Sequence, residues 1–538
     1  MRLLPLAIAA ALLAACQQTP APGAATPAGT SAAPDAQAAF AHEEAGIADL
    51  QAKMQAGSLT SRTLTQAYLD RIAAIDDAGP TLNAVIELNP DALKDADALD
   101  AERKAGKVRG PLHGIPVLLK DNIDALPMAN SAGSLALAEH HPKADAFLVR
   151  KLREAGAVVL GKTNLSEWAN FRSTRSSSGW SGRGGQTRNP YALDRNPCGS
   201  SAGTGSAIAA NLGAVGIGTE TDGSIICPSA VAGLVGIKPT VGLVSRGGII
   251  PISVSQDTAG PMTRSVADAA ILLTAIASPD PADPAAGERT DPTPIDYSAH
   301  LKADGLKGAR IGVVRKLMGY QPDTDAAMER AIAALKAAGA TVVDAEIPTL
   351  GQWDADEYQV LLYEFKDGLD RYLAESGAPH ASLAALIEFN KAHAVEEMRF
   401  FGQEIFEQAQ AKGPLTEPAY VAARDKARRL AGPEGIDAAL KAQQLDALVA
   451  PAMSPAWPTD PVNADHFTGA GYGAAAVARY PSITVPMGDV HGLPVGIVFM
   501  GTAWSEPRLV ELAYAYEQAS KARKAPRLLP TIELAPAK

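Results

Sequence analysis

The chain reads Asn196-Pro-Cys-Gly-Ser200-Ser-Ala-Gly-Thr-Gly-Ser-Ala and, shortly after, Gly216-Ile-Gly-Thr-Glu-Thr-Asp-Gly-Ser224-Ile-Ile. Residues 201–212 have the small apolar composition of a buried helix, and residues 214–218 have that of a buried strand. The glycines beside both serines allow close backbone approach and unusual dihedral angles. This stretch therefore predicts an α/β core with two serines next to a helix and a strand.

Short apolar runs alternate with helical patterns along the rest of the chain, which is typical of an α/β fold. We predict a single large domain over residues 39–538, with a mixed β-sheet core covered by helices on both faces. Residues 353–442 are expected to form a mainly helical insertion that roofs the site. The other expected strands lie within residues 116–119, 157–160, 310–314, 340–343, 445–449 and 496–499.

Composition excludes several classes of protein. The 538 residues carry a formal net charge of -11, with 47% hydrophobic and 20% charged residues, which argues against disorder and against a multispanning membrane protein. Proteins that bind nucleic acid usually display a basic surface, so no nucleic-acid partner is expected. No histidine, cysteine or carboxylate cluster has metal-ligand spacing, so we expect no metal and no cofactor.

The N-terminus predicts a secretory leader. Met1-Arg2 precedes an apolar run that ends at Ala15, too short as a helix to span a bilayer, so residues 1–15 are expected to be a signal peptide. Leu13-Ala-Ala-Cys16 resembles the lipobox of bacterial lipoproteins, in which Cys16 would be acylated; cleavage after Ala15 without acylation is the alternative. Residues 16–38 then form a flexible tether. These features predict a lipid-anchored protein of the bacterial cell envelope that faces the periplasm, with the outer membrane favoured and membrane contact through the anchor only.

Lys120 ends the apolar segment Gly114-Ile-Pro-Val-Leu-Leu-Lys120 and is the expected base for a serine nucleophile. A serine hydroxyl is a poor nucleophile until a neighbouring base takes its proton, and a lysine with a pKa near 10.4 is charged at neutral pH. Burial lowers such a pKa. A second serine between the lysine and the nucleophile can then relay the proton, so we predict a buried lysine base that serves the two serines.

Two other segments fit the sequence formulas of known motifs, but their surroundings do not fit the structures that those motifs require. The segment Gly156-Ala-Val-Val-Leu-Gly-Lys-Thr163 fits the phosphate-binding loop formula, but its variable positions are themselves the expected strand. The segment Gly199-Ser-Ser201-Ala-Gly203 fits the nucleophile elbow of α/β-hydrolases, which would make Ser201 the nucleophile. That elbow requires a preceding strand, whereas the residues before it contain two prolines and indicate a loop.

Taken together, the segments around Lys120, Ser200 and Ser224 resemble those of the amidase signature family, and the match runs from about Glu43 to Ala519. The resemblance implies the amidase signature fold, a cis peptide bond at Ser200, and a Ser-Ser-Lys triad that hydrolyses carboxylic amides through an acyl-enzyme. In that triad Ser224 attacks the amide carbonyl, and Ser200 relays its proton to Lys120.

The backbone amides of Thr221, Asp222, Gly223 and Ser224 are expected to bind the oxyanion. Many family members have Gly-Gly-Ser-Ile-Arg at this position, whereas this chain has Asp222-Gly-Ser-Ile-Ile.

Substrate identity depends on a small part of the match. Glu220-Thr-Asp-Gly-Ser-Ile and Gln256-Asp-Thr-Ala-Gly-Pro-Met look most like bacterial peptide amidases, which implies hydrolysis of the C-terminal carboxamide of short peptides with release of ammonia. The alternatives are an amidase of small aryl, aliphatic or fatty amides, the A subunit of a tRNA-dependent amidotransferase, and a non-catalytic periplasmic binding lipoprotein. The oligomeric state stays open.

Four further residues are expected to be structural. Cys198 and Cys227 bracket the two serines, and we favour buried free thiols over a disulfide. Asp257 and Arg264 are expected to form a buried pair.

Overall fold

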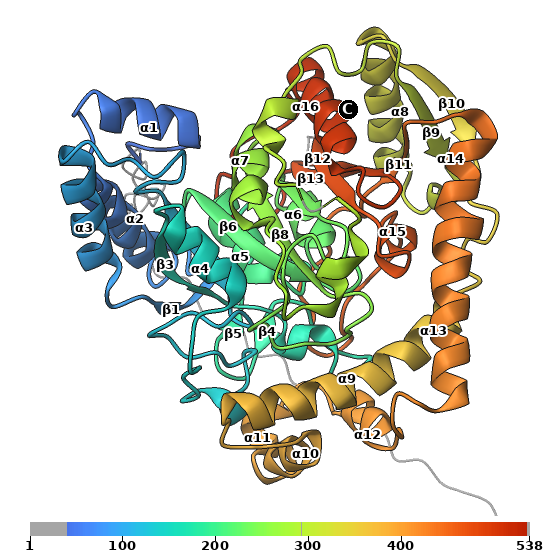
Figure 1. The fold of residues 1–538 in the computed structure, drawn as a ribbon, viewed down its shortest axis with the longest axis horizontal. Coiled ribbons are helices and arrows are strands. Elements are labelled where there is room, and N and C mark those ends of the chain that lie inside the picture. The colour runs from blue at the N-terminus through green and yellow to red at the C-terminus, as the bar shows by residue number, and fades with distance from the viewer. Residues whose placement is uncertain (1–39, 292, 535–538) are drawn as a thin grey trace, which may run out of the picture. The chain divides into compact units, whose positions relative to one another are not determined.

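An eleven-stranded mixed β-sheet forms the core of the computed structural model, which describes residues 40–291 and 293–534 (Figure 1). The helices and strands belong to one unit, His42–Lys538. The strands of the sheet are β1 (Val85–Leu88), β2 (Pro116–Lys120), β3 (Val158–Thr163), β6 (Val215–Glu220), β7 (Val235–Lys238), β8 (Thr258–Thr263), β9 (Arg310–Val314), β10 (Thr341–Ala345), β11 (Ala447–Pro451), β12 (Ser482–Val490) and β13 (Leu493–Met500). A separate hairpin pairs β4 (Trp180–Ser181) with β5 (Gly185–Gln186).

The sheet contains two parallel blocks joined by antiparallel strands. Its order is β1-β3-β2-β6-β8-β7-β12-β13-β11-β9-β10. β2 pairs in parallel with β3 and β6, and β9 pairs in parallel with β10 and β11. Parallel neighbours end at the same edge of a sheet, where ligands bind in α/β folds. The ends of β2 and β6 therefore bring Lys120 and the residues around Glu220 together.

Helices cover both faces of the sheet. On one face, α5 (Ala202–Ala209) contacts β6 and β8, and α6 (Ile226–Val231) contacts β7, β12 and β13. On the other, α7 (Val266–Ile276) and α8 (Pro322–Ala337) both contact α16 (Glu506–Ser520), and α7 also contacts α4 (Phe147–Glu154). Every residue of α5 is buried, and a Cβ at Gly203 would lie 2.3 Å from the carbonyl oxygen of Ala84. The small residues of α5 therefore allow its close packing.

Three N-terminal helices lie together at the β1 end of the sheet (Figure 1). They are α1 (Ile47–Gln55), α2 (Ser61–Ile75) and α3 (Ala92–Lys104), of which α2 packs on α3 and α3 contacts β3. The apolar positions Ile47, Leu50 and Met54 of α1 are buried, as their spacing predicts.

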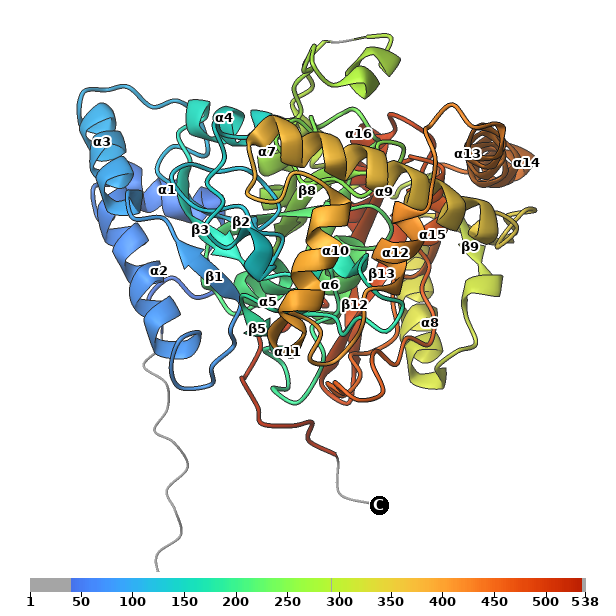
Figure 2. The same cartoon turned by 90° about the horizontal axis from the view of Figure 1, so that it is seen from below.

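Helices also make up most of the chain between β10 and β11. They are α9 (Asp354–Ser376), α10 (Leu383–Ala392), α11 (Ala394–Glu397), α12 (Glu404–Gln410), α13 (Pro418–Ala431) and α14 (Asp437–Gln443). The long helix α9 runs across the front of the molecule in Figure 2 and packs Phe365 and Leu369 in one cluster with Ile250 and Ile252. Its buried Glu364 accepts hydrogen bonds from the backbone amide and hydroxyl of Ser255, at 2.9 and 2.5 Å. α9 is thereby fixed to a loop that borders the site.

The predicted fold class is confirmed. The structure differs from the sequence prediction in that its sheet contains four strands that the prediction missed. Apolar runs mark β2, β3, β6, β9, β10, β11 and β13, whereas β1, β7, β8 and β12 are absent from the sequence prediction. β8 contains Gly260 and Pro261, and β12 contains Pro486, residues that normally argue against a strand. The segment that fits the phosphate-binding loop formula contains β3 instead. Its Lys162 side chain is fully buried, and Lys162 Nζ lies 3.1 Å from Asp121 Oδ1.

Candidate active site

Lys120 is the last residue of β2, and its side chain is completely buried. Its Nζ atom lies 2.7 Å from Ser200 Oγ, 2.9 Å from Thr219 Oγ1 and 3.2 Å from the Thr219 carbonyl oxygen. Asn122 donates to the same Thr219 hydroxyl at 3.0 Å. Thr219 belongs to β6, the parallel neighbour of β2, so the pairing of the two strands creates this arrangement.

Burial lowers the pKa of Lys120 to about 7, against the opposing charges of Asp257 and Glu220. About half of such amines are neutral at neutral pH, so Lys120 can accept a proton there. This is the property that a lysine base requires.

Ser200 follows a cis peptide bond at Gly199, as the family resemblance implies. Its side chain is completely buried, and its carbonyl oxygen accepts a hydrogen bond from the amide of Ser166 at 3.0 Å. A Cβ at residue 199 would lie 2.1 Å from Ser166 Oγ, so only glycine fits.

Ser224 lies in the loop between β6 and α6 and is 9% exposed. The buried carboxylate of Glu220, at the end of β6, accepts hydrogen bonds from the amides of Ile225 and Ile226 at 2.7 and 2.9 Å. Gly223 has a φ of 81°, and a Cβ there would lie 2.2 Å from the ring of Tyr472. Glu220 and Gly223 therefore hold the loop in one conformation.

The amides of this loop differ in how they are used. Within the part of the chain that the structure describes, the Thr221, Asp222 and Ser224 amides donate to no acceptor. The Gly223 amide is bonded to the Glu220 carboxylate, and the Thr221 hydroxyl donates to Asp257 Oδ1 at 2.6 Å. Three of the four amides predicted to bind an oxyanion are thus available for one.

Two cavities meet at Ser224. The smaller, of about 260 Å³, is also lined by Ser200 and Thr219, and the larger, of about 530 Å³, by Asp222 and Tyr472. Helix α9 borders both, through Tyr372 in the smaller and Leu361 in the larger.

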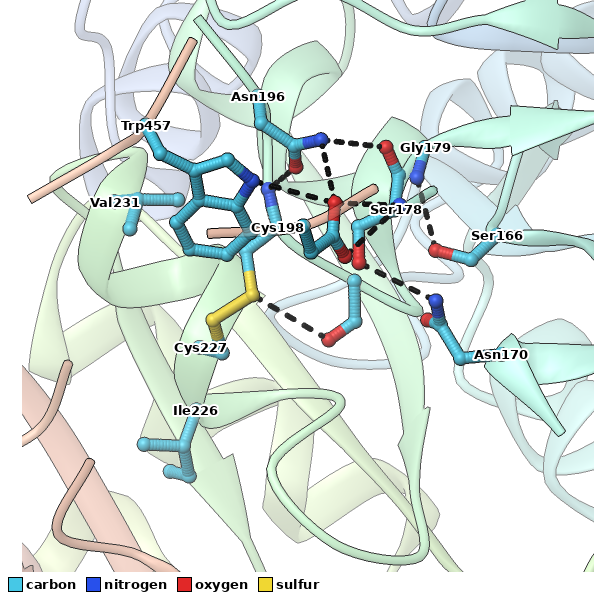
Figure 3. The surroundings of a disulfide bond; sticks show 12 residues. Ser166, Asn170, Ser178, Gly179, Asn196, Cys198, Ile226, Cys227, Val231 and Trp457 are labelled. Carbon is cyan, nitrogen blue, oxygen red and sulfur yellow. Dashed lines mark hydrogen bonds between the residues drawn. A yellow bond between two sulfur atoms is a disulfide. The ribbon is translucent and has the colours of Figure 1, made fainter. Parts of the chain in front are cut away.

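A disulfide ties the two serine loops together (Figure 3). Cys198 stands just before Ser200, Cys227 follows Ser224 in α6, and their Cα atoms are 6.1 Å apart. The amide of Cys198 also donates to Asn196 Oδ1 at 2.8 Å. The expectation of free thiols is wrong, because the turns that present the serines also bring the cysteines within bonding distance.

The alternative nucleophile Ser201 is turned away from the site. It is completely buried, and its hydroxyl donates to the carbonyl oxygen of Thr219 at 3.1 Å. Among the described residues, Ser201 lines neither cavity at Ser224, and no histidine lines either one. The geometry therefore gives no support to a nucleophile elbow.

The expected pair of Asp257 and Arg264 does not form. Arg264 donates instead to the carbonyl oxygens of Ile208 and Gly213, at 3.1 and 3.0 Å, while Asp257 lines the smaller cavity. Burial raises the pKa of Asp257 to about 6. Asn122, Thr219 and Asp257 are site residues to which the sequence patterns assign no part in the site; their signal is a polar residue in or next to the end of a strand.

In residues 40–291 and 293–534, no group of three or more histidine, cysteine, aspartate and glutamate residues is placed to hold a metal ion.

The model of the family described as Amidase matches residues 63–510. The chain belongs to the amidase family. It is an amide hydrolase, and a protein of Arabidopsis thaliana described as a probable amidase is 41% identical to it over 502 residues, which cover 91% of this chain and 93% of the relative.

Solved structures are more similar still to this amidase. A structure of the peptide amidase PAM in complex with the competitive inhibitor chymostatin has 61% identity and a TM-score of 0.90, with 91% of this chain and 100% of that chain covered. The native peptide amidase from Stenotrophomonas maltophilia has 61% identity and a TM-score of 0.88, over 91% and 99% of the two chains. The fold prediction is confirmed by this likeness.

The predicted lipid-anchored location in the bacterial cell envelope is corrected by these comparisons. Relatives similar along most of this amidase come from a plant and from the fungi Arthroderma benhamiae and Schizosaccharomyces pombe, which have no bacterial envelope. The prediction depended on a leader over residues 1–15 and on Cys16, which lie outside the described residues. These relatives make the envelope location wrong, and the prediction failed because a short apolar run before a cysteine carries little physical information. The alternative of a binding lipoprotein has no support either.

None of the helices in the described ranges is both long enough and apolar enough to cross a bilayer.

Proposed function

We propose that this amidase hydrolyses the C-terminal carboxamide of short peptides through Ser224, Ser200 and Lys120. The observation that carries the proposal is the 2.7 Å contact between Lys120 Nζ and Ser200 Oγ beneath the cavity that Ser224 lines. The likeness to the peptide amidases, at 61% identity, supports the substrate class. By comparison, the A subunit of the glutamyl-tRNA(Gln) amidotransferase of Thermosynechococcus vestitus is 34% identical over 487 residues, which cover 88% of this chain and 98% of that one.

The contacts of Lys120 suit a neutral amine. Such an amine has two hydrogens and one lone pair, and the Thr219 carbonyl oxygen can only accept a hydrogen bond. Thr219 Oγ1 already accepts from Asn122 and lies 2.9 Å from Lys120 Nζ, so it can accept a second hydrogen. With both hydrogens directed to Thr219, the lone pair faces the Ser200 hydroxyl and can take its proton.

The reaction then follows from these positions. Lys120 accepts the Ser200 proton, Ser200 accepts the Ser224 proton, and Ser224 Oγ attacks the amide carbonyl carbon. The Asp222 and Ser224 amides donate to the oxyanion. When the carbon–nitrogen bond breaks, the proton returns through Ser200 to the leaving ammonia, and water hydrolyses the acyl-enzyme by the same route.

Ammonia release from a dipeptide amide, with Ser224→Ala, Lys120→Ala and Lys120→Arg beside the wild type, tests the proposal. Loss of a member of such a catalytic unit costs on the order of 10⁴-fold in turnover. Arginine cannot release its proton at workable pH, so Lys120→Arg is expected to be as inactive as Lys120→Ala. Ser201→Ala is the matched control and should keep its activity.

Benzamide and a long-chain fatty amide complete the substrate set. Fast turnover of either, beside little turnover of the dipeptide amide, contradicts the peptide-amide assignment. Substantial activity in Ser224→Ala contradicts the assigned nucleophile.

A further inference from the structure

Asp222 places a carboxylate in the loop that carries Ser224. It stands two residues before Ser224, and its side chain is exposed where it lines the larger cavity. Within the described residues, the Asp222 carboxylate has no hydrogen-bond donor and no ion-pair partner. An unpartnered carboxylate at a reaction centre requires an explanation.

The charge of an ionised Asp222 opposes the proposed chemistry unless a proton or a cation neutralises it. Residues two apart have Cα atoms within about 7 Å, so an ionised carboxylate here would lie near the negative charge that develops on the oxyanion. Desolvation by the surrounding protein, followed by the charges of Glu357, Glu220 and Asp354, raises the pKa of Asp222 well above its usual range, and Lys238 acts in the other direction. The protein itself therefore supplies mostly negative charge at this position.

The position of the proton relay indicates which part of the substrate meets Asp222. The leaving nitrogen must receive its proton from Ser200, which lines the smaller cavity but not the larger one. The leaving group therefore points toward the smaller cavity, and the acyl part of the substrate extends into the larger one. Asp222 lies on that acyl side.

We propose that Asp222 is a specificity-determining residue that binds the α-ammonium group of short peptide amides with a free N-terminus. This inference rests on the proposed function. The α-ammonium group of an amino acid amide or dipeptide amide lies only a few bonds from the scissile carbonyl, which suits a carboxylate in the oxyanion loop.

The rest of the larger cavity suits the side chains of such substrates. Its wall includes Phe171, Trp457, Phe467 and Tyr472, which offer apolar and aromatic surface. A bound ammonium group would favour the ionised form of Asp222 and offset its repulsion of the oxyanion.

Twin substrates test the proposal: one dipeptide amide with a free N-terminus and the same compound N-acetylated. The measured quantity is the ratio of kcat/KM for the free twin to that for the acetylated twin. A hydrogen bond to a charged group is worth enough that Asp222→Asn should lower this ratio at least about tenfold. Asp222→Gly, which removes the whole side chain, should lower it similarly.

Glu375→Gln is the matched control. Glu375 is an exposed carboxylate that lines the smaller cavity, so its loss removes the same charge from the other side of Ser224 and should leave the ratio unchanged. An equal loss for both twins in Asp222→Asn overturns the proposal, because it indicates a role in loop geometry. An unchanged ratio also overturns it.

Binding separates this inference from the proposed function. Calorimetry on Ser224→Ala, with and without Asp222→Asn, measures the affinity for each twin without turnover. We expect the Asp222→Asn substitution to weaken only the free twin. If the wild type releases ammonia from neither twin, the proposed function fails, while the calorimetric comparison still decides the role of Asp222.

Discussion

Replacement of Lys120 by methionine should stabilise the protein at neutral pH while it abolishes activity. Burial lowers the pKa of Lys120 from 10.5 to about 7. Between these pH values the unfolded chain binds more protons than the folded one, so this group makes stability rise with pH. From the two pKa values, the cost of burying Lys120 is about 4 kcal/mol at pH 7 and about 1 kcal/mol at pH 9.5.

Methionine fills a similar volume and does not titrate. It loses the hydrogen bonds of Lys120 to Ser200 and Thr219, about 1 kcal/mol each, but that loss is the same at both pH values. Lys120→Met should therefore be about 2 kcal/mol more stable than the wild type at pH 7 and about 1 kcal/mol less stable at pH 9.5. The change of about 3 kcal/mol between the two pH values is independent of the hydrogen-bond term.

Equilibrium urea unfolding at pH 7 and pH 9.5 measures this difference, with refolding checked at both. Lys94→Met is the control, because the Lys94 side chain is 79% exposed and its removal should give no such pH dependence. A difference in stability between Lys120→Met and the wild type that stays constant with pH refutes the lowered pKa and, with it, the physical basis for a lysine base.

Three further outcomes are expected. The kcat/KM of the wild type should fall about tenfold per pH unit below about pH 7, as Lys120 becomes protonated; a flat acid limb, with chemistry shown to be rate-limiting, contradicts a lysine base. Cys198→Ala should lower the free energy of unfolding by about 3 kcal/mol, because the disulfide to Cys227 closes a loop across a sequence separation of 29 residues; reductant should lower the wild-type urea midpoint equally but leave that of the variant unchanged. Glu364→Ala should cost about 2–3 kcal/mol and raise KM, because this carboxylate holds α9 to Ser255; an unchanged urea midpoint would show that the contact is dispensable.

The parts of the fold that the sequence predicts are those with continuous apolar runs. β2 reads Pro-Val-Leu-Leu-Lys and lies fully buried between two parallel neighbours, so its composition alone marks it. β8 reads Thr-Ala-Gly-Pro-Met-Thr, and its pairing with β7 involves only Met262 and Thr263. Gly260 is required there because a Cβ would lie 2.0 Å from the carbonyl oxygen of Ile237. Such a requirement comes from a strand distant in sequence, and local composition cannot reveal it.

In the candidate site, too, the sequence reveals some residues, and others are recognised only from contacts between distant segments. Ser200, Ser224 and Lys120 carry the proposed chemistry in recognisable segments, and their motifs are enough to group them in one site without any geometry. Thr219 and Asn122 are ordinary polar residues in sequence, and they matter only because parallel pairing brings β6 beside β2. The two cysteines likewise meet through folding of the loops, which their separation along the chain does not indicate.

The position of Ser224 between two cavities affects how ammonia leaves and how water enters during turnover. In the proposed reaction, ammonia departs through the smaller cavity while the acyl group still occupies the larger one. The vacated space gives an incoming water direct access to the ester carbon on the side of Ser200 and Lys120. In this scheme the second half of the cycle needs no displacement of the acyl group, because water takes the place that ammonia has left.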